Sequence, residues 1–82
     1  MAEIEIFSGP GCAQCEAARR LLEQHGLPFT ERSIADDSEL TEFRLRLPRV
    51  TALPQIFVDG EHIGSTEDLQ LARNHGRTPF DI

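Results

Sequence analysis

The sequence predicts a small α/β fold, in which a four-stranded mixed sheet packs against three helices in the order β-α-β-α-β-β-α. Three observations carry this prediction. Apolar residues recur at helical spacing over residues 13–24, whereas polar and apolar residues alternate with the period of a strand over residues 3–7. Asp59-Gly60 lies between two short β-like runs, and this dipeptide favours the tight turn of a hairpin. A chain of 82 residues has room for one core, so we expect a single domain over residues 1–82.

The first half of the chain is expected to form a strand, a helix and a second strand. A turn containing glycine and proline follows the strand over residues 3–7. The next helix, over residues 13–24, has four apolar residues at helical spacing, namely Ala17, Ala18, Leu21 and Leu22. Gly26 is expected to end this helix, because glycine readily takes the left-handed conformation found just past helix ends. Residues 28–34 are expected to form the second strand, with weak alternation.

A second helix and a hairpin follow. Asp37 or Ser38 is expected to cap the helix, since both side chains can accept hydrogen bonds from the unpaired N–H groups of a first turn. Pro48 is expected to end it, because proline cannot continue the pattern of helical hydrogen bonds. Residues 55–58 and 61–63 then form the two arms of the hairpin.

The last predicted element is a third helix. Ser65 or Thr66 is expected to cap it. Glu67 and Asp68 fall in its first turn, where negative charge suits the helix dipole. Gly76 is expected to close it.

The composition excludes several classes of function. The net charge is −6, and all eight cations are arginines with no strongly basic cluster, so neither a nucleic acid nor a membrane surface is an expected partner. No apolar run is long enough to cross a bilayer, and the first residues lack the basic and apolar regions of a signal peptide. We therefore expect a cytoplasmic protein.

The cysteine count is the most informative feature of the composition. The two cysteines, Cys12 and Cys15, form one Cys-x-x-Cys. A disulfide-stapled secreted domain of this size normally carries four or more, and a structural zinc site needs four ligands. The three histidines are too widely spaced for a ligand pair, so no metal site is expected. Redox chemistry is the predicted role of the pair, and two small buried apolar residues are the alternative.

The position of Cys12, between a glycine-rich turn and a helix, favours its reactivity. The N–H groups and the positive end of the helix dipole stabilise a thiolate, the form that attacks disulfides. Cys15 lies one turn deeper, within reach of Cys12. We therefore predict that Cys12 attacks a substrate disulfide to form a mixed disulfide, which Cys15 then resolves.

Over essentially its whole length the chain resembles the glutaredoxins, a family of the thioredoxin-like fold. The resemblance rests on three segments at matching spacing: residues 4–8 before the Cys-x-x-Cys, residues 53–60, and residues 63–69. It implies a glutathione-linked thiol–disulfide oxidoreductase that reduces protein or glutathione mixed disulfides. It also implies a monomer with glutathione as co-substrate and no tightly bound cofactor.

The resemblance also assigns residues to the substrate site. Pro54 is expected to be a cis-proline, and the main chain of Leu53 beside it to pair with an extended substrate. Thr66 and Glu67 are expected at a helix N-terminus whose N–H groups receive the γ-glutamyl carboxylate of glutathione. Gln14 stands where the family has an aromatic residue, and we expect it to line the same site.

The chain departs from the family at four positions. Gly9 stands where many glutaredoxins have a lysine, and Thr41 where many have glutamine or arginine. Gln14 replaces the aromatic residue of the active-site motif, and Ala52 replaces a threonine. Loss of an exposed charge contact worth up to about 1 kcal/mol would weaken glutathione binding several-fold. We therefore predict a Cys12 pKa below the free-cysteine value of about 8.5, yet above that of relatives with the lysine.

Two alternative functions stay open. Cys12-Ala13-Gln14-Cys15 is similar to the motif of small redoxins that donate electrons to ribonucleotide reductase and are reduced by thioredoxin reductase. Residues 63–68 have the glutaredoxin form instead. The other alternative is a cluster-binding module, in which Cys12 of two chains and two glutathione molecules hold a [2Fe–2S] cluster. A small residue after the first cysteine, such as Ala13 here, marks the relatives in which cluster binding is suspected.

Overall fold

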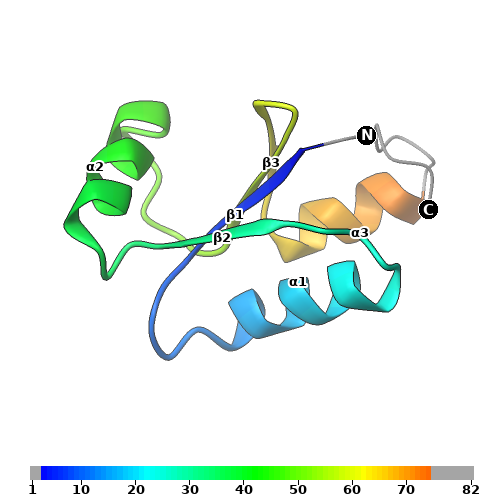
Figure 1. Ribbon diagram of the computed structural model, residues 1–82. Coiled ribbons are helices and arrows are strands. Elements are labelled where there is room, and N and C mark those ends of the chain that lie inside the picture. Colours follow the sequence, from blue (N-terminus) through cyan, green and yellow to red (C-terminus); the bar gives the residue numbers. More distant parts are fainter. Residues whose placement is uncertain (1–2, 75–82) are drawn as a thin grey trace.

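A computed structural model describes residues 3–74 and confirms the predicted order of elements (Figure 1). The elements are β1 (Ile4–Ser8), α1 (Ala13–Gln24), β2 (Thr30–Ser33), α2 (Asp37–Arg46), β3 (Gln55–Val58), β4 (Glu61–Gly64) and α3 (Thr66–Asn74). Gly76, predicted to close the last helix, lies outside the described residues. Within the described part of the chain, no helix has the length and hydropathy that crossing a membrane requires.

The four strands form one mixed sheet in the order β2-β1-β3-β4. The central strand β1 runs parallel to β2 and antiparallel to β3, and β3 forms the hairpin with β4. These directions bring the end of β1, the end of β2 and the start of β3 to the same end of the sheet. The segments that contain Cys12, Leu53 and Thr66 therefore meet there, although they are far apart in the sequence.

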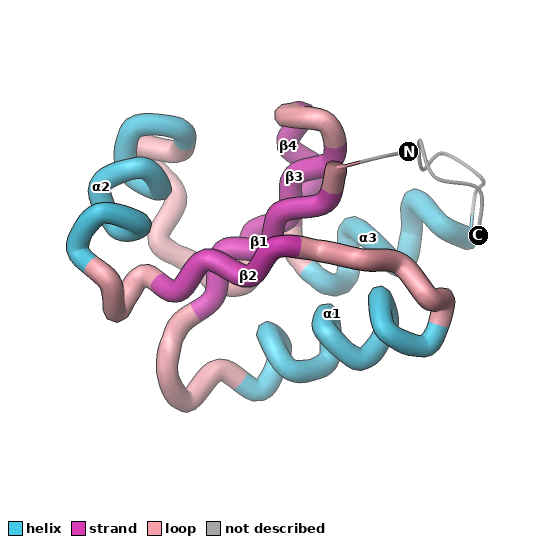
Figure 2. Tube along the Cα trace, viewed as in Figure 1, coloured by secondary structure: helices cyan, strands magenta, loops and turns pink. Residues whose placement is uncertain are grey.

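Helices cover the two faces of the sheet unequally (Figures 1 and 2). On one face, α1 and α3 pack side by side against an aliphatic core that includes Ile6, Leu22, Ile56 and Leu69. On the other face, α2 packs with Phe43 against a smaller aromatic core made with Phe7 and Phe57. As a result, β1 is buried on both faces, and so is its one charged residue, Glu5.

Most of the predicted boundaries agree with the structure, and the differences have local causes. Helix α1 spans the predicted residues, but its buried side includes Cys15, whereas Ala17 is exposed. Helix α2 is capped by Asp36, one residue before the predicted pair, because its Oδ1 accepts hydrogen bonds from the N–H groups of Ser38 and Glu39. The hairpin turn places both Asp59 and Gly60 at positive φ, +52° and +80°.

The start of α3 is a reciprocal cap between Ser65 and Asp68. The Asp68 carboxylate accepts hydrogen bonds from Ser65 N–H (2.9 Å) and from Ser65 Oγ (3.0 Å). Hydrogen bonds from the N–H group and then the hydroxyl of Ser65 hold the pKa of Asp68 below its ordinary value, and the charge of His62 adds to this effect. The charged form of Asp68 therefore stabilises the folded chain.

The Asp68 cap predicts a small pH dependence of stability. Because the folded pKa is depressed, its contribution is complete above the unfolded value of about 4 and is lost as the pH falls through the folded pKa. The variant Asp68→Asn keeps a side-chain oxygen but has no charge to lose. We expect its midpoint of thermal unfolding to fall less than that of the parent between neutral pH and about pH 3. Equal falls would contradict this role of the cap. The pKa of Asp36 is also lowered by its capping hydrogen bonds. Asp36 is present in both the parent and the variant, so its effect is the same in the two proteins.

Candidate active site

Cys12 and Cys15 are joined by a disulfide, with their Cα atoms 5.2 Å apart. Cys12 is the N-cap of α1, and the N–H group of Cys15 donates a hydrogen bond to Cys12 Sγ at 3.0 Å. Cys15 is 1% exposed, whereas Cys12 is half-buried. Cys12 is therefore the sulfur that a substrate can reach, and a backbone donor already points at it to stabilise a thiolate.

An open hollow of about 450 Å³ lies beside Cys12, lined by the turn before it and by one side of α1. Its charged residues are Glu16 and Arg19. Arg19 Nη1 is 2.9 Å from Glu31 Oε2, and the same oxygen accepts a hydrogen bond from Ser8 Oγ at 2.7 Å. Because Glu31 balances its charge, Arg19 gives the hollow no net cation, and the N–H of Cys15 is the nearer source of stabilisation for Cys12.

Leu53 and Pro54 lie at the same end of the sheet. The peptide bond between them is cis, as predicted. Pro54 is buried and Leu53 is half-buried against the aromatic core. A Cβ atom added to Gly9 would lie only 2.8 Å from Leu53 Cδ1 and 3.4 Å from Ile34 Cγ1. The Leu53 side chain therefore packs directly on the turn that leads to Cys12.

Thr66 ties the start of α3 to the first turn of α1. Its side chain is buried, and Thr66 Oγ1 donates a hydrogen bond to the carbonyl oxygen of Gln14 at 2.8 Å. The side chains of Gln14 and Glu67 are exposed. The structure thus joins two of the predicted site residues, Thr66 and Gln14, by a direct contact that no sequence pattern indicates.

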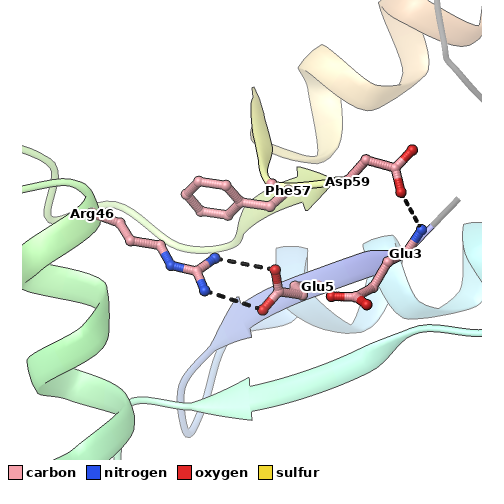
Figure 3. A pocket seen from close by; sticks show the side chains of 6 residues that line it. Glu3, Glu5, Arg46, Phe57 and Asp59 are labelled. Atoms are coloured by element: carbon pink, nitrogen blue, oxygen red, sulfur yellow. Dashed lines mark hydrogen bonds and ion pairs between the residues drawn. The ribbon is translucent and has the colours of Figure 1, made fainter.

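A larger hollow, of about 750 Å³, lies at the other end of β1 (Figure 3). Arg46 reaches into it from α2 and pairs with Glu5, with Nη1 3.1 Å from Glu5 Oε1. Arg32 pairs with the same carboxylate at 3.1 Å, and the Arg46 guanidinium lies 5.0 Å from the centre of the Phe57 ring. Since the Glu5 carboxylate is paired with both arginines and the cysteines lie at the opposite end of β1, we assign this hollow to the packing of α2 and not to the chemistry.

The described residues contain no group of three or more histidine, cysteine or acidic side chains that would hold a metal ion. The end of the sheet where Cys12 and Cys15 lie offers the chemistry of two thiols. Comparison with known proteins identifies the family that uses them. The family model of glutaredoxin matches residues 4–63.

The chain belongs to the glutaredoxin family.

Relatives from three bacteria agree with this assignment. Glutaredoxin 3 of Escherichia coli K12 is 36% identical over 69 residues, which make up 84% of this chain and 83% of the relative. The hybrid peroxiredoxin hyPrx5 of Haemophilus influenzae is 40% identical over 67 residues, which are 82% of this chain but 27% of that longer protein. The solution structure of glutaredoxin from Brucella melitensis is 33% identical, with a TM-score of 0.74 over 94% of this chain and 84% of that one.

As a glutaredoxin with a Cys12–Cys15 pair, the protein is a thiol–disulfide oxidoreductase of thioredoxin-like fold. The pair supplies two electrons when it passes from dithiol to disulfide, and it is the redox-active centre. The roles predicted for Leu53, Pro54, Thr66, Glu67 and Gln14 stay predictions at this point.

The contact between Gly9 and Leu53 predicts the effect of restoring the lysine of other glutaredoxins. Gly9→Lys alone would push Leu53 aside, because its Cβ lies too close to Leu53 Cδ1. In Gly9→Lys/Leu53→Val, the shorter side chain leaves room, and we expect glutathione to reduce the disulfide about threefold to fivefold faster than in the parent. Stopped-flow fluorescence or a coupled assay would measure the rate.

The matched control for this prediction is Gly9→Ala/Leu53→Val, which has the same Cβ and the same shorter side chain without the charge. A double variant no faster than Gly9→Ala/Leu53→Val would show that a cation at this position does not act on glutathione.

Proposed function

We propose that this glutaredoxin takes electrons from glutathione and reduces mixed disulfides between proteins and glutathione, together with protein disulfides. One observation carries the proposal. The N–H groups of Thr66 and Glu67, at the start of α3, make no hydrogen bond to an acceptor in the described residues, and the bond from Thr66 to Gln14 holds them next to the Cys12 turn. A helix start of this kind favours a carboxylate, and glutathione carries two.

The reaction proceeds in two exchanges. The Cys12 thiolate attacks the glutathione sulfur of the mixed disulfide, so the substrate protein leaves as a thiolate that takes up a proton. A second glutathione thiolate attacks the same glutathione sulfur, releasing glutathione disulfide and regenerating the Cys12 thiolate. With a protein disulfide, Cys15 attacks the mixed disulfide on Cys12, and two glutathione molecules then reduce the Cys12–Cys15 bond.

Leu53 and Pro54 frame the substrate in this proposal. The main chain of Leu53 pairs with the extended backbone on either side of the substrate sulfur, and this places the sulfur in line with Cys12 Sγ. Glu67 and Gln14 contribute the exposed rim of the site. Each of these roles concerns binding, so their loss would reduce affinity more than the intrinsic reactivity of Cys12.

The test follows NADPH consumption through glutathione reductase as glutathione reduces the oxidised protein. Thioredoxin reductase in a parallel cuvette gives the matched comparison. Fast turnover with glutathione alone supports the proposal. Turnover with thioredoxin reductase alone would replace it with the redoxin function, in which ribonucleotide reductase is the acceptor.

A peroxiredoxin is the second candidate partner. The Haemophilus relative is named as a hybrid peroxiredoxin, and a segment similar to this chain makes up 27% of it. Two domains linked in one protein meet at an effective concentration of about the millimolar range, which would favour electron exchange between them. Turnover of a purified oxidised peroxiredoxin, with a glutathionylated peptide as the comparison, would test this pairing. Equal rates would show that the peroxiredoxin is not preferred.

The remaining expectations stay predictions. A [2Fe–2S] cluster shared by two chains would give a brown protein after anaerobic reconstitution with glutathione, and a colourless protein would rule it out. The monomeric state, the cytoplasmic location and the single domain over residues 1–82 are predictions that size measurement, fractionation and limited proteolysis would check.

A further inference from the structure

Gln55, the first residue of β3, is a buried amide with both ends occupied. It follows Pro54 directly, and it is 6% exposed. Its Nε2 donates a hydrogen bond to the carbonyl oxygen of Ala52 at 3.0 Å, and its Oε1 lies 2.7 Å from His62 Nε2. A buried amide without partners would cost stability, so the two contacts account for how Gln55 can lie in the core at all.

The hydrogen bond to Ala52 spans the two residues proposed to frame the substrate. Ala52 and Gln55 flank Leu53 and Pro54, so the Gln55 side chain closes a small ring around this segment. Among the described residues, backbone hydrogen bonds outside the helices and strands support this loop only near its start, from Val50 N–H to the carbonyl of Leu47 at 3.2 Å. The side chain of Gln55 is therefore the main polar restraint on the position of Leu53.

His62, on β4, orients the amide of Gln55. Because Gln55 Nε2 is directed at Ala52, its Oε1 must accept a hydrogen bond, and His62 Nε2 must carry the proton that is donated. The imidazole ring itself lies against Phe57, with the ring centres 5.1 Å apart and the planes 34° from parallel. Ring packing thus fixes His62, His62 fixes Gln55, and Gln55 fixes the carbonyl next to Leu53.

We propose that Gln55 and His62 are positioning residues, which hold the Leu53 main chain in the place where it pairs with the peptide backbone of the substrate. The inference rests on the proposed substrate-framing role of Leu53. Neither residue touches the sulfur atoms. Their effect is confined to substrates that have a peptide backbone next to the disulfide.

Two disulfide probes separate this role from general damage to the site. The first joins thionitrobenzoate to the cysteine of a short peptide, and the second joins it to mercaptoethanol, which has no peptide groups. In each case, the Cys12 thiolate attacks the sulfur of the thiol compound and thionitrobenzoate leaves with the electron pair. Cys15 then displaces the reduced thiol and forms the Cys12–Cys15 disulfide. The yellow colour of free thionitrobenzoate gives the second-order rate constant of the attack.

Four variants dissect the chain of contacts. Gln55→Met removes both hydrogen bonds at similar length, and Gln55→Glu keeps an acceptor for His62 but loses the donor to Ala52. His62→Phe keeps a ring against Phe57 without a donor, whereas His62→Gln restores a donor without the ring. Circular dichroism and thermal unfolding show which variants fold. Because His62 is exposed, its variants give an independent test if the variants of the buried Gln55 fail to fold.

We expect the first three variants to lose about fivefold in rate on the peptide probe and to keep the parent rate on the mercaptoethanol probe. His62→Gln is expected to recover most of the loss on the peptide probe. Equal losses on both probes, or full activity on the peptide probe in folded variants, would overturn the proposal. Neither probe contains glutathione, so failure of the protein to accept electrons from glutathione would show separately, in the coupled assay of the parent protein.

Discussion

Replacing Cys12 with serine is expected to abolish disulfide reduction, lowering the rate on the peptide–thionitrobenzoate probe by more than about a thousandfold. The hydroxyl group of serine does not ionise near neutral pH, and the N–H of Cys15 that points at this atom at 3.0 Å does not change that. The measurement is the release of thionitrobenzoate from excess reduced protein in a single turnover. A variant that keeps a tenth of the parent rate would show that Cys15 attacks substrates directly.

Cys15→Ser is the matched control, since it alters the second thiol alone. Cys12 remains able to attack, so the first release of thionitrobenzoate should stay within about threefold of the parent. The peptide should then remain attached to Cys12 as a mixed disulfide, because no second thiol displaces it. Mass spectrometry of the unreduced protein would show the added peptide, and an unmodified protein would contradict the assignment of the two roles.

The second large effect is expected from Arg46→Leu, which should lower the free energy of unfolding by about 2 kcal/mol. Glu5 is buried in the middle of the sheet, and the variant leaves it with one guanidinium partner, Arg32, instead of two. The loss stays below the roughly 3–5 kcal/mol of a fully buried broken pair because Arg32 remains and Arg46 is partly exposed. Thermal unfolding should show a midpoint lower by roughly 10 °C.

Two further variants make the Arg46 prediction specific. Glu5→Leu/Arg46→Leu removes the buried charge together with its partner and should be more stable than Arg46→Leu alone. Arg44→Leu changes an exposed arginine of the same helix and should leave the midpoint within about 2 °C of the parent. The rate at which Cys12 attacks the peptide probe should be unchanged in these two variants and in Arg46→Leu, because the Arg46 hollow lies at the far end of β1. A slower Cys12 in folded Arg46→Leu would give that hollow a part in the chemistry.

Local patterns in the sequence were sufficient for most of the fold. The helical spacing of residues 13–24 and the Asp59-Gly60 turn act over neighbouring residues, and the structure confirms both elements. The resemblance to glutaredoxins added the cis bond before Pro54, which no local pattern of this chain indicates. The strand over 28–34 is shorter than expected, because β2 lies at an edge of the sheet and its ladder with β1 runs only from Thr30 to Ser33.

What the sequence did not show depends on contacts between distant segments. The alternation over residues 3–7 placed Glu5 on a polar face, but α2 covers that face and Arg46 neutralises the carboxylate. The contact between Gln55 and His62 also joins two elements, β3 and β4, and neither residue type at those positions indicates a partner. Such pairs become visible only once the register of the sheet is known.

Because distant segments meet at one end of the sheet, unfolding is expected to affect the reactivity of the thiols and the recognition of substrates differently. Cys12 and Cys15 are close neighbours in the chain and meet in any conformation with a turn between them, whereas Leu53 and Thr66 reach them only in the folded protein. A denatured chain therefore retains two thiols that attack disulfides without preference. With the proposed substrate role of Leu53, the ratio of rates on the peptide and mercaptoethanol probes is expected to fall in step with the folded population, so that substrate selectivity would report cooperative folding.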